Sequence, residues 1–151
     1  MFKTIVWATD GSENADHALS VARALAREHD SPLVVMHVVQ RYTTKAGLAV
    51  YADEDQVQAK LKRVVDELSQ EGLTASLKIV DHVGPQPAHE IADLAREAGA
   101  DLIVVGTRGH AALSGLVLGS VTQRLLHVAP CPILVVPASQ GREIQGEPAG
   151  N

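Results

Sequence analysis

The fold is decided first by residues 4–26, TIVWATDGSENADHALSVARALA, because the spacing of apolar residues changes in the middle of this stretch. Residues 4–8 form a short apolar run rich in β-branched side chains, which is typical of a buried strand. From Ala15 onward the apolar residues recur at helical spacing, and Ser12 is placed to cap that helix at its amino end. A strand followed directly by a helix that is apolar on one face is the first half of a βαβ unit, so this stretch predicts an α/β protein.

The same alternation of strand and helix continues along the chain. Four further apolar runs are expected to be strands, at residues 33–39, 77–80, 102–105 and 133–136. Helical patterns lie between them, and Gly72, Gly99 and Pro130 mark where these helices end. The strands are apolar on both faces, so helices must cover both sides of the sheet. The sequence therefore predicts an open, doubly wound, five-stranded parallel sheet of Rossmann-like type, with strand order 3-2-1-4-5.

One domain is expected over residues 1–137, because a chain of 151 residues can bury a single core but has little room for two. Two segments show no clear period and are expected to lie outside that core. Residues 40–55 are predicted to form a mobile or partly disordered loop. Residues 138–151 are rich in Gly, Pro, Gln and Glu and are predicted to be a disordered tail.

The composition excludes several classes of protein. The net charge is −5 and the basic residues are scattered, so no basic stripe is available for a nucleic acid or an anionic membrane surface. No apolar stretch is long enough to span a bilayer, and the first residues lack the pattern of a signal peptide. Cys131 is the single cysteine, so an internal disulfide is impossible. These features favour a cytoplasmic protein.

The candidate site follows from the predicted topology. Ligands of open α/β sheets bind at the carboxyl ends of the strands, where the strand order reverses. In the loop after the fourth predicted strand come Gly106, Arg108 and Gly109, and later Gly119 and Ser120 at the start of a helix. Glycines let main-chain N–H groups approach phosphate oxygens, and the amino end of a helix adds partial positive charge. Arg108 is a further candidate for a phosphate contact.

The loop after the first strand holds the second group of candidates, Thr9 and Asp10. The carboxylate of Asp10 is suited to accept hydrogen bonds from ribose hydroxyls, or to bind a divalent ion such as Mg²⁺ beside the phosphates. Structural alternatives remain open here, because Asp10 and Ser120 are also residue types that cap helices. His37 ends an apolar strand, which favours a buried, hydrogen-bonded histidine over a ligand. Cys131 is expected to be a small packing residue.

The spacing Gly106-x2-Gly109-x9-Gly119-Ser120 resembles the nucleotide-binding pattern Gly-x2-Gly-x9-Gly-Ser/Thr of the universal stress protein family. The opening residues 5–12, the Met36-His37-Val38 of the second strand and the closing residues 131–136 are similar to that family as well. The resemblance covers residues 2–137 and points to the ATP-binding members.

The resemblance implies a role for each matching position. It places Asp10 near the ribose and the metal–phosphate region, and the main chain of Val38 at the adenine edge. It implies that Gly106 and Gly109 line the ribose and phosphates, and that the phosphates are cradled by Gly119, Ser120 and Val121. It also implies a homodimer formed by antiparallel pairing of the last strands, with Ile133 and Val135 at the interface.

The expected function is therefore a stress-response or regulatory module that binds ATP or a related adenine nucleotide. Two alternatives stay open: a nucleotide-free dimeric module that acts through protein partners, and a weak ATP hydrolase. Hydrolysis is disfavoured because no general base is evident. A Walker loop and a dinucleotide-binding glycine motif after the first strand are both absent from the sequence.

Overall fold

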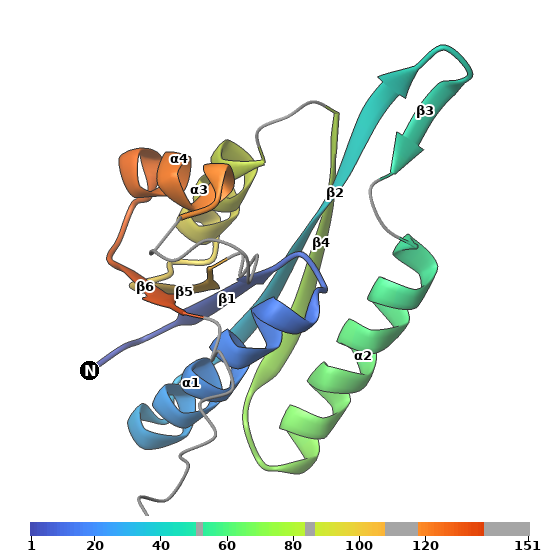
Figure 1. Cartoon of the computed structure of the whole chain (residues 1–151). Helices are drawn as coiled ribbons and strands as arrows, with labels where there is room; N and C mark the ends of the chain where they lie inside the picture. The colour runs from blue at the N-terminus through green and yellow to red at the C-terminus, as the bar shows by residue number, and fades with distance from the viewer. Residues whose placement is uncertain (51–52, 84–86, 108–117, 138–151) are drawn as a thin grey trace, which may run out of the picture.

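The computed structural model describes residues 1–50, 53–83, 87–107 and 118–137, except for the side chain of Asn14 (Figure 1). The tail predicted at residues 138–151 lies outside this part of the chain, and so do Arg108 and Gly109. The elements in chain order are β1 (Ile5–Thr9), α1 (Glu13–His29), β2 (Leu33–Thr44), β3 (Gly47–Val50), α2 (Glu54–Gln70), β4 (Ala75–Val83), α3 (Ala88–Glu97), β5 (Leu102–Gly106), α4 (Ser120–Val128) and β6 (Ile133–Val136).

The sheet is built around β1, which pairs in parallel with β2 on one side and with β5 on the other. The parallel strand β4 adds to β2, and β6 adds to β5. The five parallel strands thus lie in the order β4-β2-β1-β5-β6, which is the predicted order 3-2-1-4-5. The predicted fold class is confirmed, with one addition, because β3 pairs antiparallel with the end of β2 and brings the sheet to six strands.

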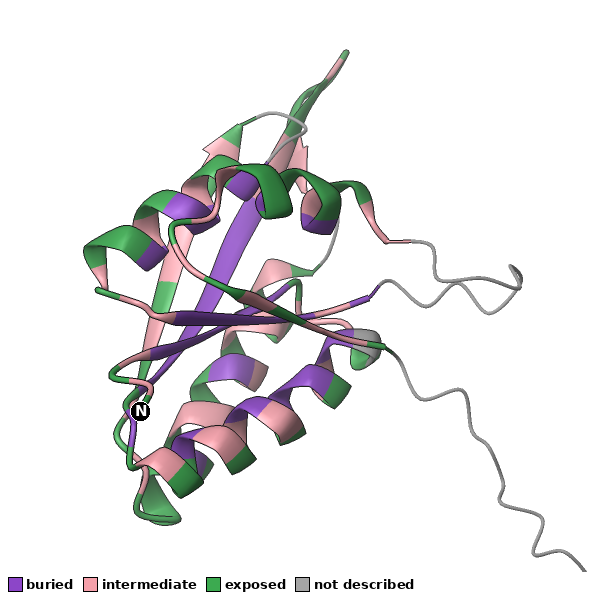
Figure 2. Ribbon diagram, turned by 90° about the vertical axis from the view of Figure 1, so that its left-hand side faces the viewer, coloured by how far each residue is buried: buried purple, intermediate pink, exposed green. Residues whose placement is uncertain are grey.

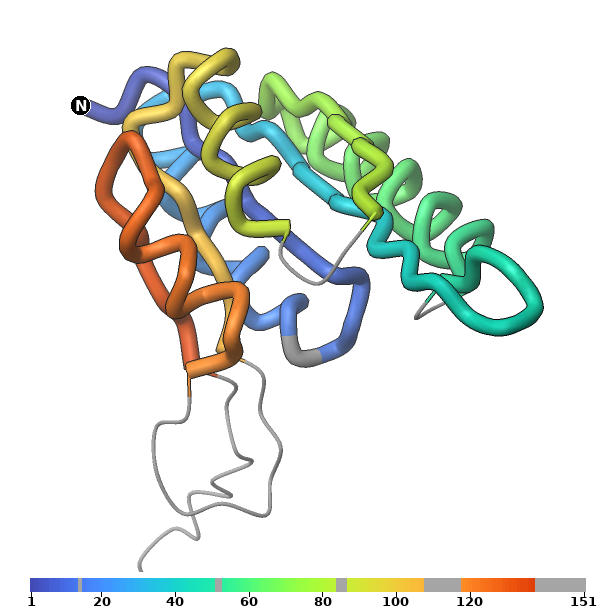
Figure 3. The backbone as a smooth tube through the Cα atoms, turned by 90° about the horizontal axis from the view of Figure 1, so that it is seen from above, coloured from blue at the N-terminus to red at the C-terminus, as the bar shows by residue number. Residues whose placement is uncertain are grey.

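The expectation of a loop over residues 40–55 is wrong. β2 continues to Thr44, turns, and returns as β3, forming a hairpin that projects beyond the rest of the sheet (Figures 1 and 3). In the turn, Thr44 Oγ1 donates to the carbonyl of Gly47 at 2.8 Å, and Gly47 takes the left-handed φ of 118°. The hairpin has no buried face, so its sequence lacks the apolar period that identifies core strands. The last residues of the segment then begin α2.

Helices cover both faces of the sheet, as the sequence predicts. α1 and α2 pack on one face, against a cluster that contains Ile5, Leu33 and Val35. α3 and α4 pack on the other face, against a cluster that contains Val6, Val34 and Ile103. Figure 2 shows the buried strands between the two helical layers. In the described part of the chain, no helix is long and apolar enough to cross a membrane.

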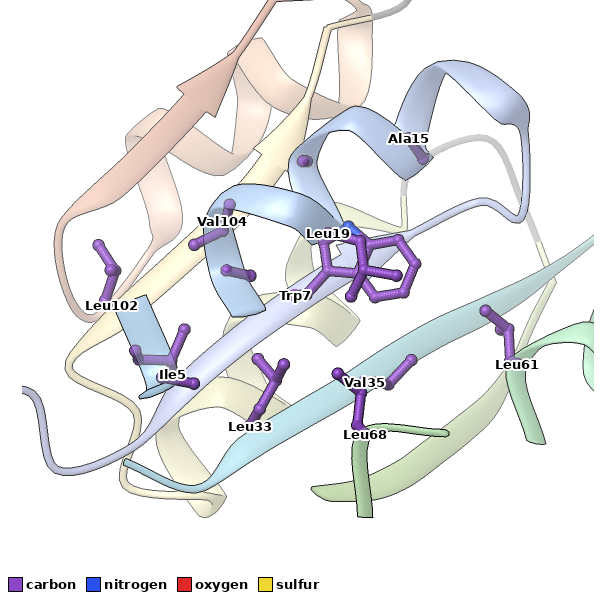
Figure 4. Packing of buried hydrophobic residues seen from close by; sticks show 13 residues of the cluster. Ile5, Trp7, Ala15, Leu19, Leu33, Val35, Leu61, Leu68, Leu102 and Val104 are labelled. Atoms are coloured by element: carbon purple, nitrogen blue, oxygen red, sulfur yellow. The ribbon is translucent and has the colours of Figure 1, made fainter. Parts of the chain in front are cut away.

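Trp7 is the largest side chain of the first cluster and is fully buried beneath α1, beside Leu19 (Figure 4). Its indole Nε1 has no hydrogen-bond partner in the described structure. A buried indole N–H usually finds an acceptor, so this position combines a large apolar contribution with an unsatisfied donor.

The four helices begin in two different ways. The side chains of Ser12 and Asp53 cap α1 and α2 by accepting hydrogen bonds from Ala15 N and Gln56 N. At α3 and α4 the capping positions are Pro87 and Gly119, and neither provides a side-chain hydrogen bond. The alternative reading of Ser120 as a helix cap is therefore wrong, because Gly119 occupies that position and Ser120 is the first helical residue.

Candidate functional site

A cavity of about 380 Å³ lies at the carboxyl ends of β1, β2 and β5. This is the position that the topology predicts, and the volume falls within the range of about 300–1,000 Å³ that is common for small-molecule sites. The cavity is bounded on one side by the β1–α1 loop and the start of α2, and on the other by the starts of α3 and α4.

Most of the predicted site residues meet around this cavity. Its lining includes six of them, namely Thr9, Asp10, Val38, Gly106, Gly119 and Val121. Ser120 is exposed at the start of α4 and is not part of the lining. Arg108 and Gly109 lie outside the described residues, so their predicted contacts stay predictions.

The β1–α1 loop is a tight turn held by its own polar atoms. Ser12 N donates to Asp10 Oδ1 at 2.9 Å, and Gly11 N donates to Thr9 Oγ1 at 3.0 Å. Gly11 itself has the left-handed φ of 82°, which favours glycine. The alternative of Asp10 as the helix cap is thus replaced by a division of roles, in which Asp10 closes the turn and Ser12 caps α1. Asp10 is exposed at the edge of the cavity.

α2 packs directly on this loop and fixes its position. Lys60 Nζ donates to the carbonyl of Gly11 at 3.1 Å and forms an ion pair with Asp16 of α1 at 2.8 Å. A Cβ atom on Gly11 would lie only 2.6 Å from Cγ1 of Val57, so the helix touches the loop main chain closely. The wall formed by the β1–α1 loop and the start of α2 is therefore held in place by contacts between these two segments.

The opposite wall contains the amino end of α4. Gly119 lines the cavity with φ −60° and ψ 155°, and it leaves the first N–H groups of the helix without a side-chain acceptor. Gln123 Nε2 donates to the carbonyl of Leu118 at 3.1 Å, which fixes the residue before Gly119. The first N–H groups of a helix, together with its dipole, favour an anion at this position.

Two titratable side chains of the described lining, His37 and Glu54, were not predicted as site residues. The prediction of a buried, hydrogen-bonded histidine is confirmed, since His37 is 2% exposed and both ring nitrogens have partners. Glu54 was missed because its segment was expected to be a loop. The signal was present in the sequence, as Asp53 and Glu54 directly precede the helical period that starts at Val57.

The described lining contains two carboxylates, Asp10 and Glu54, and one histidine, His37, while no lysine or arginine side chain lies among its residues. No group of three or more metal-ligating side chains occurs in the described ranges. A divalent ion at Asp10 would therefore need most of its oxygen ligands from a bound phosphate and from water.

Cys131 lies away from the cavity and packs, half-buried, against the cluster beneath α3 and α4. Burial raises the pKa of its thiol, and the negative charge of Asp101 adds a smaller effect in the same direction. A thiol that stays protonated near neutral pH is a weak nucleophile, which agrees with the predicted packing role.

Sequence comparison relates the whole described fold to known proteins. Residues 1–137 match the sequence profile of the Universal stress protein family. A universal stress protein of Thermus aquaticus is 36% identical over 138 residues, which cover 90% of this chain and 99% of the relative.

Solved structures show the same fold. The universal stress protein of Archaeoglobus fulgidus in complex with dAMP is 28% identical, with a TM-score of 0.63 over 88% of this chain and 96% of that one. A universal stress protein solved in complex with cAMP is 27% identical, with a TM-score of 0.64 over 91% of this chain and 98% of that one.

Proposed function

The chain belongs to the universal stress protein family, and from this premise we propose that it binds ATP or a related adenine nucleotide in the cavity between the β1–α1 loop and α4. The observation that carries the proposal is the meeting of six predicted nucleotide-site residues around one cavity at the topological switch point. The adenine nucleotides dAMP and cAMP in two structural neighbours support the ligand class.

The phosphates would lie at the amino end of α4. Gly119 has no side chain to block the approach, and the uncapped N–H groups of the helix are donors for phosphate oxygens. Val121 lines the cavity as the second residue of the helix. Gly106 ends β5 on the same side, and we assign Ser120, Arg108 and Gly109 to the phosphate region as further candidates.

The nucleoside would lie toward β1 and β2. Asp10, exposed at the edge of the cavity, is suited to accept hydrogen bonds from ribose hydroxyls, and Thr9 precedes it. Val38 lines the cavity on β2, and its main chain is the candidate contact for the base edge. Where Mg²⁺ accompanies ATP, Asp10 is the candidate ligand from the protein, because its exposed carboxylate lies at the edge of the cavity. No group of three or more metal-ligating side chains occurs among the described residues, so the other ligands would be phosphate oxygens and water.

The test is a calorimetric titration of ATP with Mg²⁺ into the wild-type protein and Gly119→Val. The branched side chain would fill the space that the phosphates need, while φ −60° and ψ 155° are allowed for valine, so the fold should persist. We expect the affinity to fall by at least about tenfold. Leu126→Val is the matched control, since Leu126 is 51% exposed on the same helix and lies outside the lining.

Unchanged affinity in a folded Gly119→Val protein would contradict the phosphate assignment. Absence of saturable binding by the wild type would favour the alternative of a nucleotide-free dimeric module. Multiple-turnover release of phosphate in the same samples would favour the alternative of a weak ATP hydrolase.

We also propose that the chain forms a homodimer through β6. This strand pairs only with β5 in the described sheet, so its outer edge offers main-chain groups for pairing with a second copy. Ile133 and Val135 pack partly against the core of their own chain, whereas Leu134 is 37% exposed. Leu134→Asp should therefore shift the mass measured by light scattering from dimer to monomer, and a wild-type protein that is monomeric would contradict the proposal.

A further inference from the structure

The wall of the cavity contains a buried pair of side chains, His37 on β2 and Glu54 at the start of α2. Nδ1 of His37 lies 2.9 Å from the main-chain oxygen of Thr9, and Nε2 lies 2.9 Å from Oε2 of Glu54. The side chains of His37 and Glu54 are 3% and 15% exposed. Both contacts are therefore shielded from water.

These two contacts require a proton on each side of the imidazole. A main-chain carbonyl can only accept, so Nδ1 must donate its hydrogen to Thr9. A neutral imidazole would then present the lone pair of Nε2 to an oxygen of Glu54, which is repulsive unless a proton lies between the two atoms. The geometry thus indicates one shared proton in the contact between His37 and Glu54.

The position of Glu54 favours the charged form of this pair. Glu54 is the first residue of α2, and the partial positive charge at a helix amino end stabilises a carboxylate. The shared proton is then carried by His37, and the contact is a charge-assisted hydrogen bond between imidazolium and carboxylate.

The pair joins three segments that form the cavity. His37 belongs to β2, its Nδ1 holds the end of β1 one residue before Asp10, and its Nε2 holds the start of α2. The same helix supports the β1–α1 loop through Lys60. Loss of the shared proton would replace an attraction at this junction with a repulsion.

Other titratable groups on the surrounding elements include Asp10 after β1, Asp16 on α1, Asp53 before α2, Asp55 and Lys60 on α2, and Lys78, Asp81 and His82 on β4. Asp16 is paired with Lys60, Asp81 with Arg41, and His82 with Glu90. Asp10, Asp53, Asp55 and Lys78 are exposed. In the described residues, the imidazole of His37 pairs with the main-chain oxygen of Thr9 and with one charged side chain, that of Glu54, so Glu54 is the charge to which it responds most directly.

We propose that His37 and Glu54 are positioning residues whose shared proton holds the start of α2 against the cavity, so that nucleotide affinity falls when a rise in pH removes this proton. The binding half of this inference rests on the proposed nucleotide site. The structural half concerns the junction alone, and it is testable without a ligand.

The experiment compares the wild type with Glu54→Gln. An amide N–H of the glutamine can donate to the lone pair of a neutral His37, so this variant keeps the hydrogen bond without the shared proton. ATP with Mg²⁺ is titrated into both proteins between about pH 6 and about pH 9, the range in which histidine commonly titrates. Titration of ATP itself is the same for both proteins and cancels in the ratio of their dissociation constants.

We expect the wild type to lose about tenfold in affinity relative to Glu54→Gln as the pH rises through this range, in keeping with the loss of one charge-assisted hydrogen bond. Glu67→Gln removes an exposed carboxylate from the same helix and should follow the wild-type profile. Parallel profiles for the wild type and Glu54→Gln would overturn the inference while leaving the proposed nucleotide site intact.

A second measurement separates the inference from the proposed function. The free energy of unfolding without ligand should fall with rising pH in the wild type relative to Glu54→Gln, because the proton shared between His37 Nε2 and Glu54 Oε2 stabilises only the folded state, in which the two atoms lie 2.9 Å apart. If neither protein binds nucleotide at any pH, the proposed function fails, and the unfolding profiles still test the shared proton between His37 and Glu54. Identical unfolding profiles of the two proteins would show that this proton does not stabilise the contact.

Discussion

The two helical layers of this protein border the same cavity but are built differently. α1 and α2 have 17 residues each, and the side chains of Ser12 and Asp53 cap them. α3 and α4 have 10 and 9 residues and start at Pro87 and Gly119, which provide no side-chain cap. The helices of the longer layer each begin with a side-chain hydrogen bond from the capping residue, whereas the capping residues of the shorter layer supply none.

The polar contacts within the two layers follow the same division. Lys60 ties α2 to α1 and to the β1–α1 loop, and Glu54 ties α2 to β2. Against the other face, α3 and α4 pack mainly through small and apolar side chains such as Ala92 and Leu125, while Glu90 of α3 pairs with His82 of β4 outside the cavity lining. The comparison teaches that one wall of the cavity is preorganised by internal bonds, and that the other offers the donors that the nucleotide would complete.

The largest expected effect is the loss of stability when a buried leucine of either helical layer is truncated. Leu61 on α2 and Leu125 on α4 are both fully buried, and truncation of either to alanine should cost about 2–5 kcal/mol of unfolding free energy. Leu125 also lines the cavity, and Leu61 does not. Leu125→Ala should therefore weaken nucleotide binding, while Leu61→Ala should leave it unchanged. Urea unfolding and calorimetry measure the two quantities, and equal affinities in both variants would break the distinction.

A smaller effect is expected where α2 meets the β1–α1 loop. Gly11→Ala introduces a side chain at φ 82° and places its Cβ 2.6 Å from Val57 Cγ1. The left-handed backbone and the overpacking should together cost about 2–3 kcal/mol of unfolding free energy. The double variant Gly11→Ala/Val57→Ala should remove the contact but keep the backbone strain. Its unfolding free energy should exceed the value expected from adding the two single losses, and simple additivity would show that the wall is not tightly packed there.

The third prediction exchanges the capping properties of α4 and α2. Gly119→Asp supplies a carboxylate at the capping position of α4, where φ and ψ already suit a helix cap, and should stabilise the protein by up to about 1 kcal/mol. The same carboxylate should oppose a bound phosphate and weaken nucleotide affinity. Asp53→Ala is the converse change, because it removes the cap of α2 outside the lining and should cost about 1 kcal/mol with unchanged affinity. A Gly119→Asp protein with wild-type affinity would argue against phosphates at this helix end.

The smallest expected effect lies at the amino ends of β1 and β5, at the end of the strands that is opposite to the cavity. Burial is the largest single influence on the pKa of Asp101 and raises it, but hydrogen bonds from the main-chain N–H groups of Lys3 and Thr4 outweigh burial and lower the pKa below its usual value of 3.8. A carboxyl group with a lowered pKa stabilises the fold above that value, and this contribution is lost as the pH falls through the pKa of the folded state.

Because Asp101 is only partly buried, the effect should stay below about 1 kcal/mol. Acid unfolding of Asp101→Asn should show a shallower decline in stability below about pH 4 than the wild type. Affinity for nucleotide should be equal in the two proteins, and a change in affinity would contradict the separation of this end of the strands from the cavity.

The sequence was sufficient for the parts of the fold that bury an apolar face. The period of residues 4–26 predicted β1 and α1, and continuous apolar runs predicted the five parallel strands. The hairpin of β2 and β3 was missed because main-chain pairing holds it together without a buried face. The partner of His37 was missed for the same reason, since Glu54 follows that hairpin. The positions of Asp10, Gly106 and Gly119 after predicted strands were sufficient to predict that they lie around one cavity. The sequence pattern did not indicate that His37 and Glu54 would form a hydrogen bond in its wall.

The unpartnered indole of Trp7 has a practical consequence. Trp7 is the only tryptophan of the chain, so tryptophan fluorescence, excited selectively above the tyrosine absorption, originates at one point beneath α1. Its emission therefore reports on the α1–α2 layer, whereas circular dichroism reports on all helices together. If the two signals change together during unfolding, both layers melt as one cooperative unit. If circular dichroism is lost first while the tryptophan emission persists, the layer of α3 and α4 unfolds before the layer of α1 and α2. A comparison of the two signals would then measure that local unfolding.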